Sequence, residues 1–379
     1  MLYREIGRTG LRAGVVGMGT EFLDSKPYDL IERTIHTALD FGINIMDVFM
    51  PGEEIRRKIG KALRGRRDKV MLQGHVCSVE IDQKYGISRD FKTCVSYFEN
   101  LLRCLETDYI DFGMLFFMDS EEALNDVQNN GILAYMLEQK QKGVIRHIGA
   151  SSHNAAIAKK LVEMGVIDLL MFSINVAYDL TGAEKDLLEK EEYNFEKALD
   201  PRRMELYKLC EKNSVGITVM KSLCAGKLLS AEHTPFKEPM SVGQCIHYAL
   251  TRPAVSSVLV GCASPEQVRE AIRYFEMTDD EKNYSHIIRD SRSATMKGIC
   301  VYCSHCLPCP ANIDIASVHK YLDVALLDAD NIPPGIRGNY NELKAHGSDC
   351  TSCGNCEQRC PFEVRIIENM RQTAKLFGH

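Results

Sequence analysis

The 379-residue sequence has no long hydrophobic run, no apolar N-terminal stretch and no excess of basic residues. A membrane-spanning helix needs about 18 or more consecutive apolar residues, and no segment approaches that length. The opening residues, MLYREIGRTG, lack the apolar stretch of a secretion signal, so we expect a cytoplasmic protein. The formal net charge of -6 provides no basic surface for a nucleic-acid backbone. We therefore expect neither a membrane nor a nucleic acid as partner.

Cysteine, in contrast, is abundant, with 15 residues. A chain of this length can bury enough apolar surface to fold without disulfide bonds, and the cysteines are unevenly spaced. Several are scattered and are interpreted as small buried apolar residues; these are Cys77, Cys94, Cys104, Cys210, Cys224, Cys245 and Cys262. The others fall into two tight clusters near the C-terminus, and these clusters predict a metal centre.

The two clusters have the spacing of iron-sulfur ligands. The first reads Cys300-x2-Cys303-x2-Cys306-x2-Cys309-Pro310, and the second reads Cys350-x2-Cys353-x2-Cys356-x3-Cys360-Pro361. Three thiolates at two-residue gaps can surround three corners of a cubane, and in two-cluster ferredoxins the fourth ligand comes from the other motif. We therefore expect two 4Fe-4S clusters, held by one set of Cys300, Cys303, Cys306 and Cys360 and another of Cys350, Cys353, Cys356 and Cys309.

Zinc is the alternative occupant, because cysteines at paired two-residue gaps also form tetrahedral zinc sites. Zinc motifs usually place two close pairs on opposite sides of a loop, whereas each motif here runs four cysteines together and ends in proline. This pattern favours iron and sulfide. The first motif closes with a two-residue gap instead of three, which leaves the assignment of Cys309 open. The length between the motifs predicts an α-helical ferredoxin-like module over residues 298–379, after a polar linker at 279–297.

In residues 1–278, short apolar runs alternate with amphipathic stretches, a pattern typical of a parallel α/β fold. Eight runs are expected to be strands: Val15–Gly19, Ile43–Asp47, Val70–Gly74, Ile110–Leu115, His147–Ser151, Leu169–Ile174, Gly216–Met220 and Ser257–Gly261. With a helix after each strand they predict a (β/α)8 TIM barrel of the usual size. A hairpin is expected to precede it, at residues 2–13.

This segment resembles the aldo/keto reductase family. The resemblance is carried in chain order by six stretches: Ile6-Gly7-Arg8-Thr9-Gly10-Leu11, Gly42-Ile43-Asn44-x2-Asp47, Ile59-Gly60-Lys61-Ala62-Leu63, Asp108-Tyr109-Ile110-Asp111, Gly143-Val144-Ile145-Arg146-His147-Ile148-Gly149-Ala150-Ser151 and Val258-Leu259-Val260-Gly261. The whole chain is similar to the branch of oxidoreductases that fuse this barrel to a C-terminal 4Fe-4S domain. The resemblance implies a redox enzyme.

The catalytic residues that the resemblance implies are mostly changed. The family uses an Asp, Tyr, Lys and His tetrad, of which Asp47 matches the Asp. No tyrosine stands near Pro51 and Gly52, where the family has one, while His75 occupies the Lys position and Phe116 the His position. Ordinary carbonyl reduction by that tetrad is therefore not expected.

The nicotinamide site implied by the resemblance is altered as well. The positions that bind the carboxamide correspond to Ser151, Ser152 and Asn175, which can still form hydrogen bonds. The Lys and Arg that hold the 2'-phosphate are replaced by Gly261 and Gln267, with a loss of charge-assisted bonds of about 1.5 to 3 kcal/mol each. Backbone amides after Gly261 can still hold an anion. NAD(H), a flavin or no nucleotide stay open, and NADPH specificity is not expected.

Polar residues at strand ends mark the catalytic candidates, because TIM-barrel active sites lie at the C-terminal ends of the strands. Asp47 and His75 end adjacent strands, where a carboxylate can orient an imidazole that donates and accepts protons. His75 is the predicted proton donor, although a histidine bonded to a backbone carbonyl is the structural alternative. Lys221 follows the seventh strand, where barrels often bind an anionic group, and is otherwise a surface lysine.

Three functions are compatible with these residues. In the first, a ferredoxin or flavodoxin donates electrons to two clusters, and these reduce a small molecule or flavin at the barrel mouth while His75 and Asp47 manage the protons. The second is an NADH-dependent aldo/keto reductase with structural clusters. The third is a non-catalytic electron-transfer or sensor subunit. Clusters pass one electron at a time whereas a hydride carries two, so the first hypothesis requires a flavin or a substrate that tolerates a radical.

Overall fold

The computed structural model describes residues 1–82, 84–180, 200–234, 236–282, 284, 298, 300, 306–326, 329–330, 332, 334–360 and 363–379. The chain forms two compact units. The first comprises Met1–Ser230 with Pro239–His286, and the second comprises Ala231–Glu238 with Ile287–His379. Each unit is considered by itself below.

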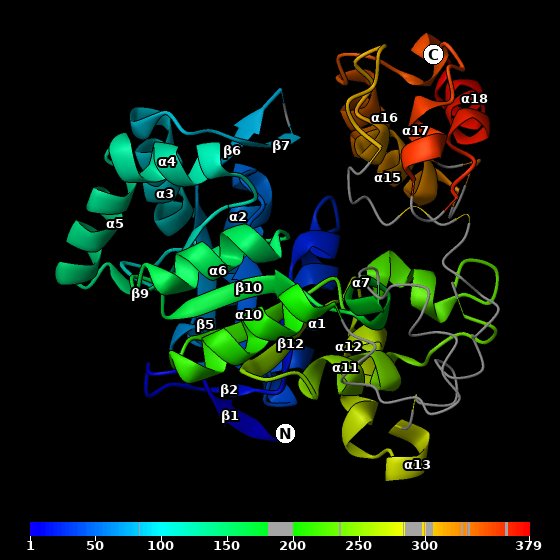
Figure 1. The fold of residues 1–379 in the computed structure, drawn as a ribbon. Coiled ribbons are helices and arrows are strands. Elements are labelled where there is room, and N and C mark those ends of the chain that lie inside the picture. The colour runs from blue at the N-terminus through cyan, green and yellow to red at the C-terminus, as the bar shows by residue number, and fades with distance from the viewer. Residues whose placement is uncertain are drawn as a thin grey trace. The chain divides into compact units, whose positions relative to one another are not determined.

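The first unit is built around eight parallel strands that close into a barrel (Figure 1). In chain order the strands are β3 (Val16–Gly19), β4 (Ile45–Val48), β5 (Met71–Val76), β8 (Ile110–Leu115), β9 (Ile145–Ser152), β10 (Leu169–Ser173), β11 (Gly216–Met220) and β12 (Val255–Gly261). Each of these strands is hydrogen-bonded to the barrel strands before and after it in this order, and β12 pairs with β3 to close the ring. The predicted (β/α)8 barrel and all of its strands are confirmed.

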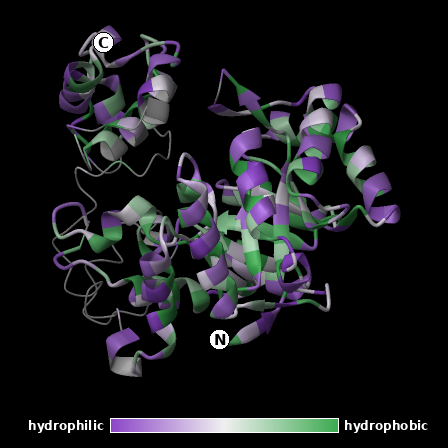
Figure 2. Ribbon diagram, turned by 180° about the vertical axis from the view of Figure 1, so that it is seen from behind, coloured by the Kyte–Doolittle hydropathy of each residue, from purple (hydrophilic) through white to green (hydrophobic). Residues whose placement is uncertain are grey.

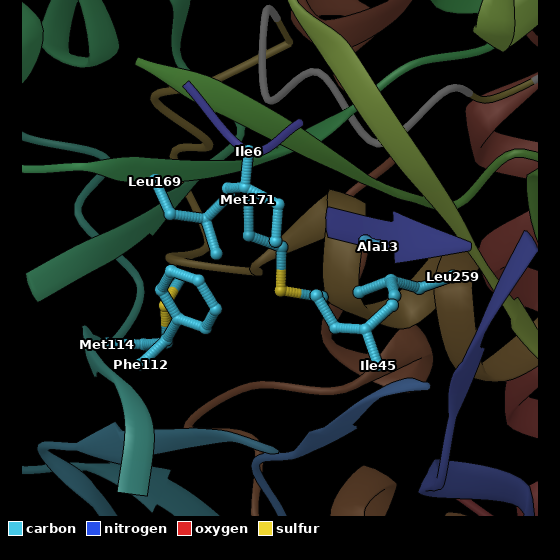
Figure 3. Packing of buried hydrophobic residues seen from close by; sticks show 8 residues of the cluster. All are labelled: Ile6, Ala13, Ile45, Phe112, Met114, Leu169, Met171 and Leu259. Atoms are coloured by element: carbon cyan, nitrogen blue, oxygen red, sulfur yellow. The ribbon is translucent and has the colours of Figure 1, made fainter. Parts of the chain in front are cut away.

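Alternate strands fill the barrel with a layer of large apolar side chains. Figure 3 shows eight members of this cluster, namely Ile6, Ala13, Ile45, Phe112, Met114, Leu169, Met171 and Leu259. Two glycines on the other strands make room for them. A Cβ on Gly17 would lie 2.6 Å from Leu259 and 2.8 Å from Ile45, and one on Gly149 would lie 2.4 Å from the sulfur of Met114. Side chains on β3 and β9 at these positions would therefore force the layer apart.

Helices cover the outside of the barrel. They are α1 (Tyr28–Asp40), α2 (Glu53–Ala62), α3 (Phe91–Cys104), α4 (Glu121–Asn129), α5 (Ile132–Gln141), α6 (Ala155–Glu163), α7 (Val176–Leu180), α10 (Pro201–Lys212), α11 (Val242–Leu250), α12 (Pro265–Ile272) and α13 (Asp279–Lys282). Side chains cap several N-termini, as where Asp90 accepts a 2.9 Å bond from the Thr93 amide before α3. Figure 2 shows hydrophobic residues gathered on the strands and hydrophilic ones on the outer faces of the helices.

Two antiparallel hairpins accompany the barrel. The N-terminal one, β1 (Tyr3–Glu5) and β2 (Arg12–Gly14), confirms the predicted hairpin and sends Ile6 and Ala13 into the apolar layer. The second, β6 (Ser78–Ile81) and β7 (Lys84–Ile87), follows β5 directly and was not predicted. It connects the end of β5 to α3.

The second unit is helical in its described part, as the sequence predicts. Its helices are α15 (Ile315–Ala325), α16 (Pro334–Asn341), α17 (Asn355–Arg359) and α18 (Ile366–Phe377). The packing of α15 against α18 forms its core, with Val318 and Met370 nearly free of solvent contact. The expected linker 279–297 begins in α13 of the first unit, and most of it lies outside the described residues.

Candidate functional site

Asp47 and His75 form a buried pair inside the barrel. The parallel pairing of β4 with β5 sets Asp47 opposite Gln73. Side chains alternate along a strand, so His75, two residues after Gln73, points to the same inner face as Gln73 and lies nearer the C-terminal end of the strand. His75 Nε2 lies 2.7 Å from Asp47 Oδ1, and only 1% and 3% of the two side chains are exposed. The structure therefore brings together the two residues that were expected to share protons.

Aromatic rings enclose the imidazole of His75. The rings of Phe116 and Phe49 meet it edge-on, with centroids at 5.2 and 6.2 Å, and stack on one another at 5.7 Å. The carbonyl of Phe49 accepts a 2.5 Å hydrogen bond from the Ser78 hydroxyl, which fixes that wall in place. The enclosure keeps water from the pair.

One nitrogen of His75 is left for a ligand. Nδ1 is buried and has no hydrogen-bond partner among the described residues, although buried polar atoms are nearly always paired. If Nε2 donates its proton to Asp47, Nδ1 of the neutral ring carries a lone pair and can accept a proton. A protonated ring would donate from the same atom.

Lys221 is not part of this pair. It follows β11 as an exposed residue with a positive φ of 59°. Its backbone carbonyl accepts a 2.9 Å hydrogen bond from the Asn175 amide. Within the described part of the chain no hydrogen bond or ion pair joins its side chain to Asp47 or His75. The anion-binding role of Lys221 therefore stays a prediction.

The residues expected to bind a carboxamide already have partners within the protein. The Ser151 hydroxyl accepts the Phe117 amide at 2.9 Å, and the Ser152 hydroxyl donates to Asp119 Oδ1 at 3.0 Å. Asn175 also accepts the Tyr178 amide at 2.9 Å and is 1% exposed. These groups hold the loops that follow β8, β9 and β10.

The loop after β12, which was expected to hold an anion, is partly taken up by contacts within the protein. The ring of Phe22 packs against Gly261, where a Cβ would lie 2.4 Å from ring carbons. The Gln267 side chain accepts the Ala263 amide at 2.6 Å and so takes up one backbone donor of this loop. Gly261 therefore leaves room for the ring of Phe22, a contact that sequence reasoning did not foresee.

A second acid–histidine pair lies at the ends of β8 and β9. His153 Nδ1 is 2.8 Å from Asp119 Oδ2, and the His153 backbone amide donates to Oδ1 at 2.6 Å. Burial alone would raise the pKa of Asp119, but the hydrogen bonds from His153 and Ser152 outweigh burial and lower this pKa below its usual value. Asp119 therefore stays ionised and organises the loop.

Arg89 holds the backbone of the loop that carries Phe116, one of the rings around His75. It follows β7, and its Nη2 donates to the carbonyls of Phe116 and Phe117 at 2.9 and 3.0 Å. Nothing in the sequence pattern points to Arg89, because its place depends on the unpredicted hairpin. It is the main residue of the site that sequence reasoning missed.

In the second unit the structure describes all of the predicted ligands except Cys303, which lies outside the described residues. Cys306 and Cys356 are buried, Cys353 is exposed, and Cys300, Cys309, Cys350 and Cys360 are half-buried. Burial raises the pKa of the Cys356 thiol. In the described ranges no three His, Cys, Asp or Glu side chains surround a common point.

Arg359 ties the two cysteine motifs together. It ends α17, next to Cys360 of the second motif, and its Nη1 donates to the carbonyls of Pro308 at 2.7 Å and Cys306 at 3.4 Å in the first motif. The residue before the last cysteine of one motif therefore touches the chain that carries the cysteines of the other. This arrangement fits a donor set shared between the motifs.

Comparison with known proteins identifies both parts of the chain. The family model of the aldo/keto reductase family matches residues 15–242. The chain belongs to the aldo/keto reductase family. A 4Fe-4S dicluster domain model matches residues 299–365, which include every predicted cysteine ligand. This aldo/keto reductase family member is therefore an oxidoreductase with a C-terminal iron-sulfur domain for electron transfer.

Its relatives support the same conclusion. The chain is 25% identical over 293 residues to the uncharacterized oxidoreductase YqkF of Bacillus subtilis, covering 72% of this chain and 90% of YqkF. It is 29% identical over 164 residues to the aldo-keto reductase YhdN of B. subtilis, covering 40% of this chain and 47% of YhdN. The holo form of aldo-keto reductase AKR11C1 from Bacillus halodurans shares the barrel fold, with a TM-score of 0.58 and 20% identity over 77% of this chain and 95% of that structure.

No helix in the described part of this aldo/keto reductase family member is long and apolar enough to cross a membrane.

Proposed function

We propose that this oxidoreductase passes electrons through two 4Fe-4S clusters to a small molecule or a flavin at the barrel mouth, with His75 and Asp47 handling the protons. A ferredoxin or flavodoxin is the proposed electron donor. The observation that carries the proposal is the buried Asp47–His75 pair: His75 Nδ1 has no hydrogen-bond partner among the described residues, and the rings of Phe49 and Phe116 lie against the imidazole. Such a pair is arranged for proton transfer in a dry pocket.

The cysteine motifs fit iron and sulfide with shared donors. Bound 4Fe-4S clusters would supply electrons one at a time. We assign Cys300, Cys303, Cys306 and Cys360 to one cluster and Cys350, Cys353, Cys356 and Cys309 to the other. The bond from Arg359 to the Pro308 carbonyl supports this assignment, because it holds the chain beside Cys360 against the first motif.

Within the barrel, side chains of this protein bind the substrate or flavin and orient the imidazole that exchanges protons with it. Asp47 holds Nε2 of His75 and so directs Nδ1 toward the substrate side of the ring. His75 then gives or takes a proton at Nδ1 as the charge on the reduced molecule changes. Phe49 and Phe116 exclude water and present flat apolar surfaces that suit a planar, conjugated substrate or flavin. Lys221 is proposed to hold an anionic group of that molecule.

The contacts of Ser151, Ser152 and Asn175 weigh against the NADH-dependent alternative. The Ser152 hydroxyl already donates to Asp119 and the Asn175 amide to the Lys221 carbonyl, so these two groups have fewer hydrogen bonds left to offer a carboxamide. Fluorescence titration with NADH and NADPH separates the two functions. Our proposal expects weak binding of both, and tight, saturable binding of NADH would favour the alternative.

The proposal is tested with protein purified and reconstituted without oxygen, using low-potential electron donors and a panel of conjugated metabolites. Asp47→Asn and His75→Gln are expected to lower turnover by about 10²- to 10⁴-fold, the contribution of a positioned general acid or base. His36→Gln is the matched control, because His36 is half-buried on α1, where its Nε2 lies 2.9 Å from the Ala62 carbonyl. Electron transfer that proceeds unchanged in both site variants would instead identify a non-catalytic carrier or sensor.

A further inference from the structure

A column of polar side chains runs through the interior of the barrel below His75. In a TIM barrel the inward-facing residues form layers of four, contributed by alternate strands. The strand registers place Gly17, Gln73, Gly149 and Thr218 in one such layer. Gln73 and Thr218 face each other across the barrel, and the Thr218 hydroxyl donates to Gln73 Oε1 at 3.0 Å. Both residues are completely buried.

The layers on either side of this one each add a polar residue. The layer nearer the barrel mouth contains Asp47, and the layer nearer the bottom contains Ser257. The other members of these two layers belong to the apolar cluster of Figure 3: Met114, Met171 and Leu259 with Asp47, and Ile45, Phe112 and Leu169 with Ser257. Polar groups enclosed by apolar layers are costly to bury unless they are hydrogen-bonded, so the column needs partners inside the barrel.

Two atoms of this column have no hydrogen-bond partner among the described residues. They are Gln73 Nε2 and Ser257 Oγ, and both are buried. Native proteins nearly always pair such groups, either with other protein atoms or with an ordered water. A buried water takes about two to four hydrogen bonds from polar groups around it. An amide that can only donate and a hydroxyl that can donate or accept are a suitable pair of partners for one water.

Thr218 brings the two atoms to the same side of the barrel. It is the register partner of Ser257 on the neighbouring strand, and Gln73 reaches across the interior to it. The residues on this side are small. Ser257 is the smallest member of its layer, and a Cβ on Gly17 would lie 2.8 Å from Ser257 Oγ. The hydroxyl therefore points toward a position that carries no side chain.

We propose that a water molecule is bound inside the barrel, where it accepts a hydrogen bond from Gln73 Nε2 and forms a second one with Ser257 Oγ. This water pairs both of the buried atoms that the protein itself leaves unpaired. It also fixes the carboxamide of Gln73 in the layer directly beneath Asp47. The buried carboxylate of the Asp47–His75 pair therefore has a polar layer below it, whichever substrate the barrel mouth binds.

Urea unfolding of the full-length protein tests the site with a matched pair of serines. Ser256 and Ser257 are neighbours on β12, and the Ser256 hydroxyl donates to the Glu5 carbonyl at 2.9 Å. Ser256→Ala removes a paired hydroxyl and should lower the urea midpoint. Ser257→Ala should lower it as well, because the water pairs that hydroxyl. An unpaired hydroxyl predicts the reverse, since alanine would then remove a buried polar group that has no bond to lose.

Gln73→Met provides a second measurement in the same assay. Loss of either Gln73 Nε2 or Ser257 Oγ breaks the bridge through the water, so the shifts of Gln73→Met and Ser257→Ala should be less than additive in the double variant. Gln73→Met combined with Ser256→Ala should give additive shifts, because the Ser256 hydroxyl bonds to Glu5 instead.

A crystal structure of the unaltered full-length protein decides the matter even where a variant does not fold. We expect electron density for one water within about 3.2 Å of both Gln73 Nε2 and Ser257 Oγ. The proposal is overturned if this part of the interior is dry, if the two side chains bond directly to each other, if Ser257→Ala raises the urea midpoint, or if the Gln73–Ser257 cycle is additive. These measurements need no substrate and no electron donor, so a failure here is distinct from a failure of the proposed function.

Discussion

Replacing His75 with leucine should show how much the Asp47–His75 pair contributes to the free energy of unfolding. The change leaves the Asp47 carboxylate, only 3% exposed, with no imidazole partner 2.7 Å away. Removing one partner of a buried charged pair costs about 3 to 5 kcal/mol. Asp47→Asn keeps a polar group opposite the ring and should cost about 1.5 to 3 kcal/mol, the contribution of a hydrogen bond to a charged group. Once Asp47→Asn has removed the charge, His75→Leu should cost much less.

The assay is a double-variant cycle in urea, with unfolding of the barrel followed by circular dichroism under anaerobic conditions. The double variant should lose less free energy of unfolding than the two single variants lose together, by at least about 2 kcal/mol. His36→Leu serves as the control, because this histidine has one bond to a carbonyl and should cost at most about 1.5 kcal/mol. If His75→Leu costs no more than the control and the cycle is additive, the buried pair does not exist as described and the site argument fails.

Two further predictions concern the N-terminal face of the barrel and the cysteine motifs. Burial opposes ionisation of Asp168, but bonds from His147, Lys140 and Arg8 hold its pKa well below the usual value. Its stabilisation is therefore present above the unfolded pKa of about 3.9 and lost as the pH falls through the folded one. Asp168→Asn should lower stability at pH 7 by about 1 to 3 kcal/mol, and the difference in urea midpoint should shrink below about pH 4; a constant difference contradicts this. In the iron-sulfur domain, Arg359→Gln removes the bond to the Pro308 carbonyl and should weaken iron retention against a chelator by about 10- to 100-fold. Arg365→Gln, an exposed control, should change retention little, and equal loss from both variants would refute the role of Arg359.

The barrel was predictable from sequence because parallel strands buried on both faces are continuous apolar runs. The errors lie at strand ends. The run at His147 was expected to begin the fifth strand, but β9 begins at Ile145, which pairs with Ile110 on the neighbouring strand β8. Hydrogen bonding to a neighbouring strand, which the local pattern does not contain, decides such boundaries.

The Asp47–His75 contact could be anticipated because neighbouring parallel strands bring their ends to one face. The residues that surround the pair could not be anticipated in this way. Arg89 reaches the aromatic rings around His75 from the end of a hairpin whose alternating pattern is short and polar, and Phe22 reaches Gly261 from a turn after β3. Contacts between residues far apart in sequence determine these positions, so a single sequence carries no local sign of them.

The most direct test of the account is metal and sulfide analysis of protein purified without oxygen. Thiolates arranged for two 4Fe-4S clusters should give about eight iron atoms and eight acid-labile sulfides per chain. Cys360→Ser and Cys309→Ser should each reduce both values together. Zinc with no acid-labile sulfide would contradict the account, because the C-terminal domain would then hold no cluster that can pass electrons.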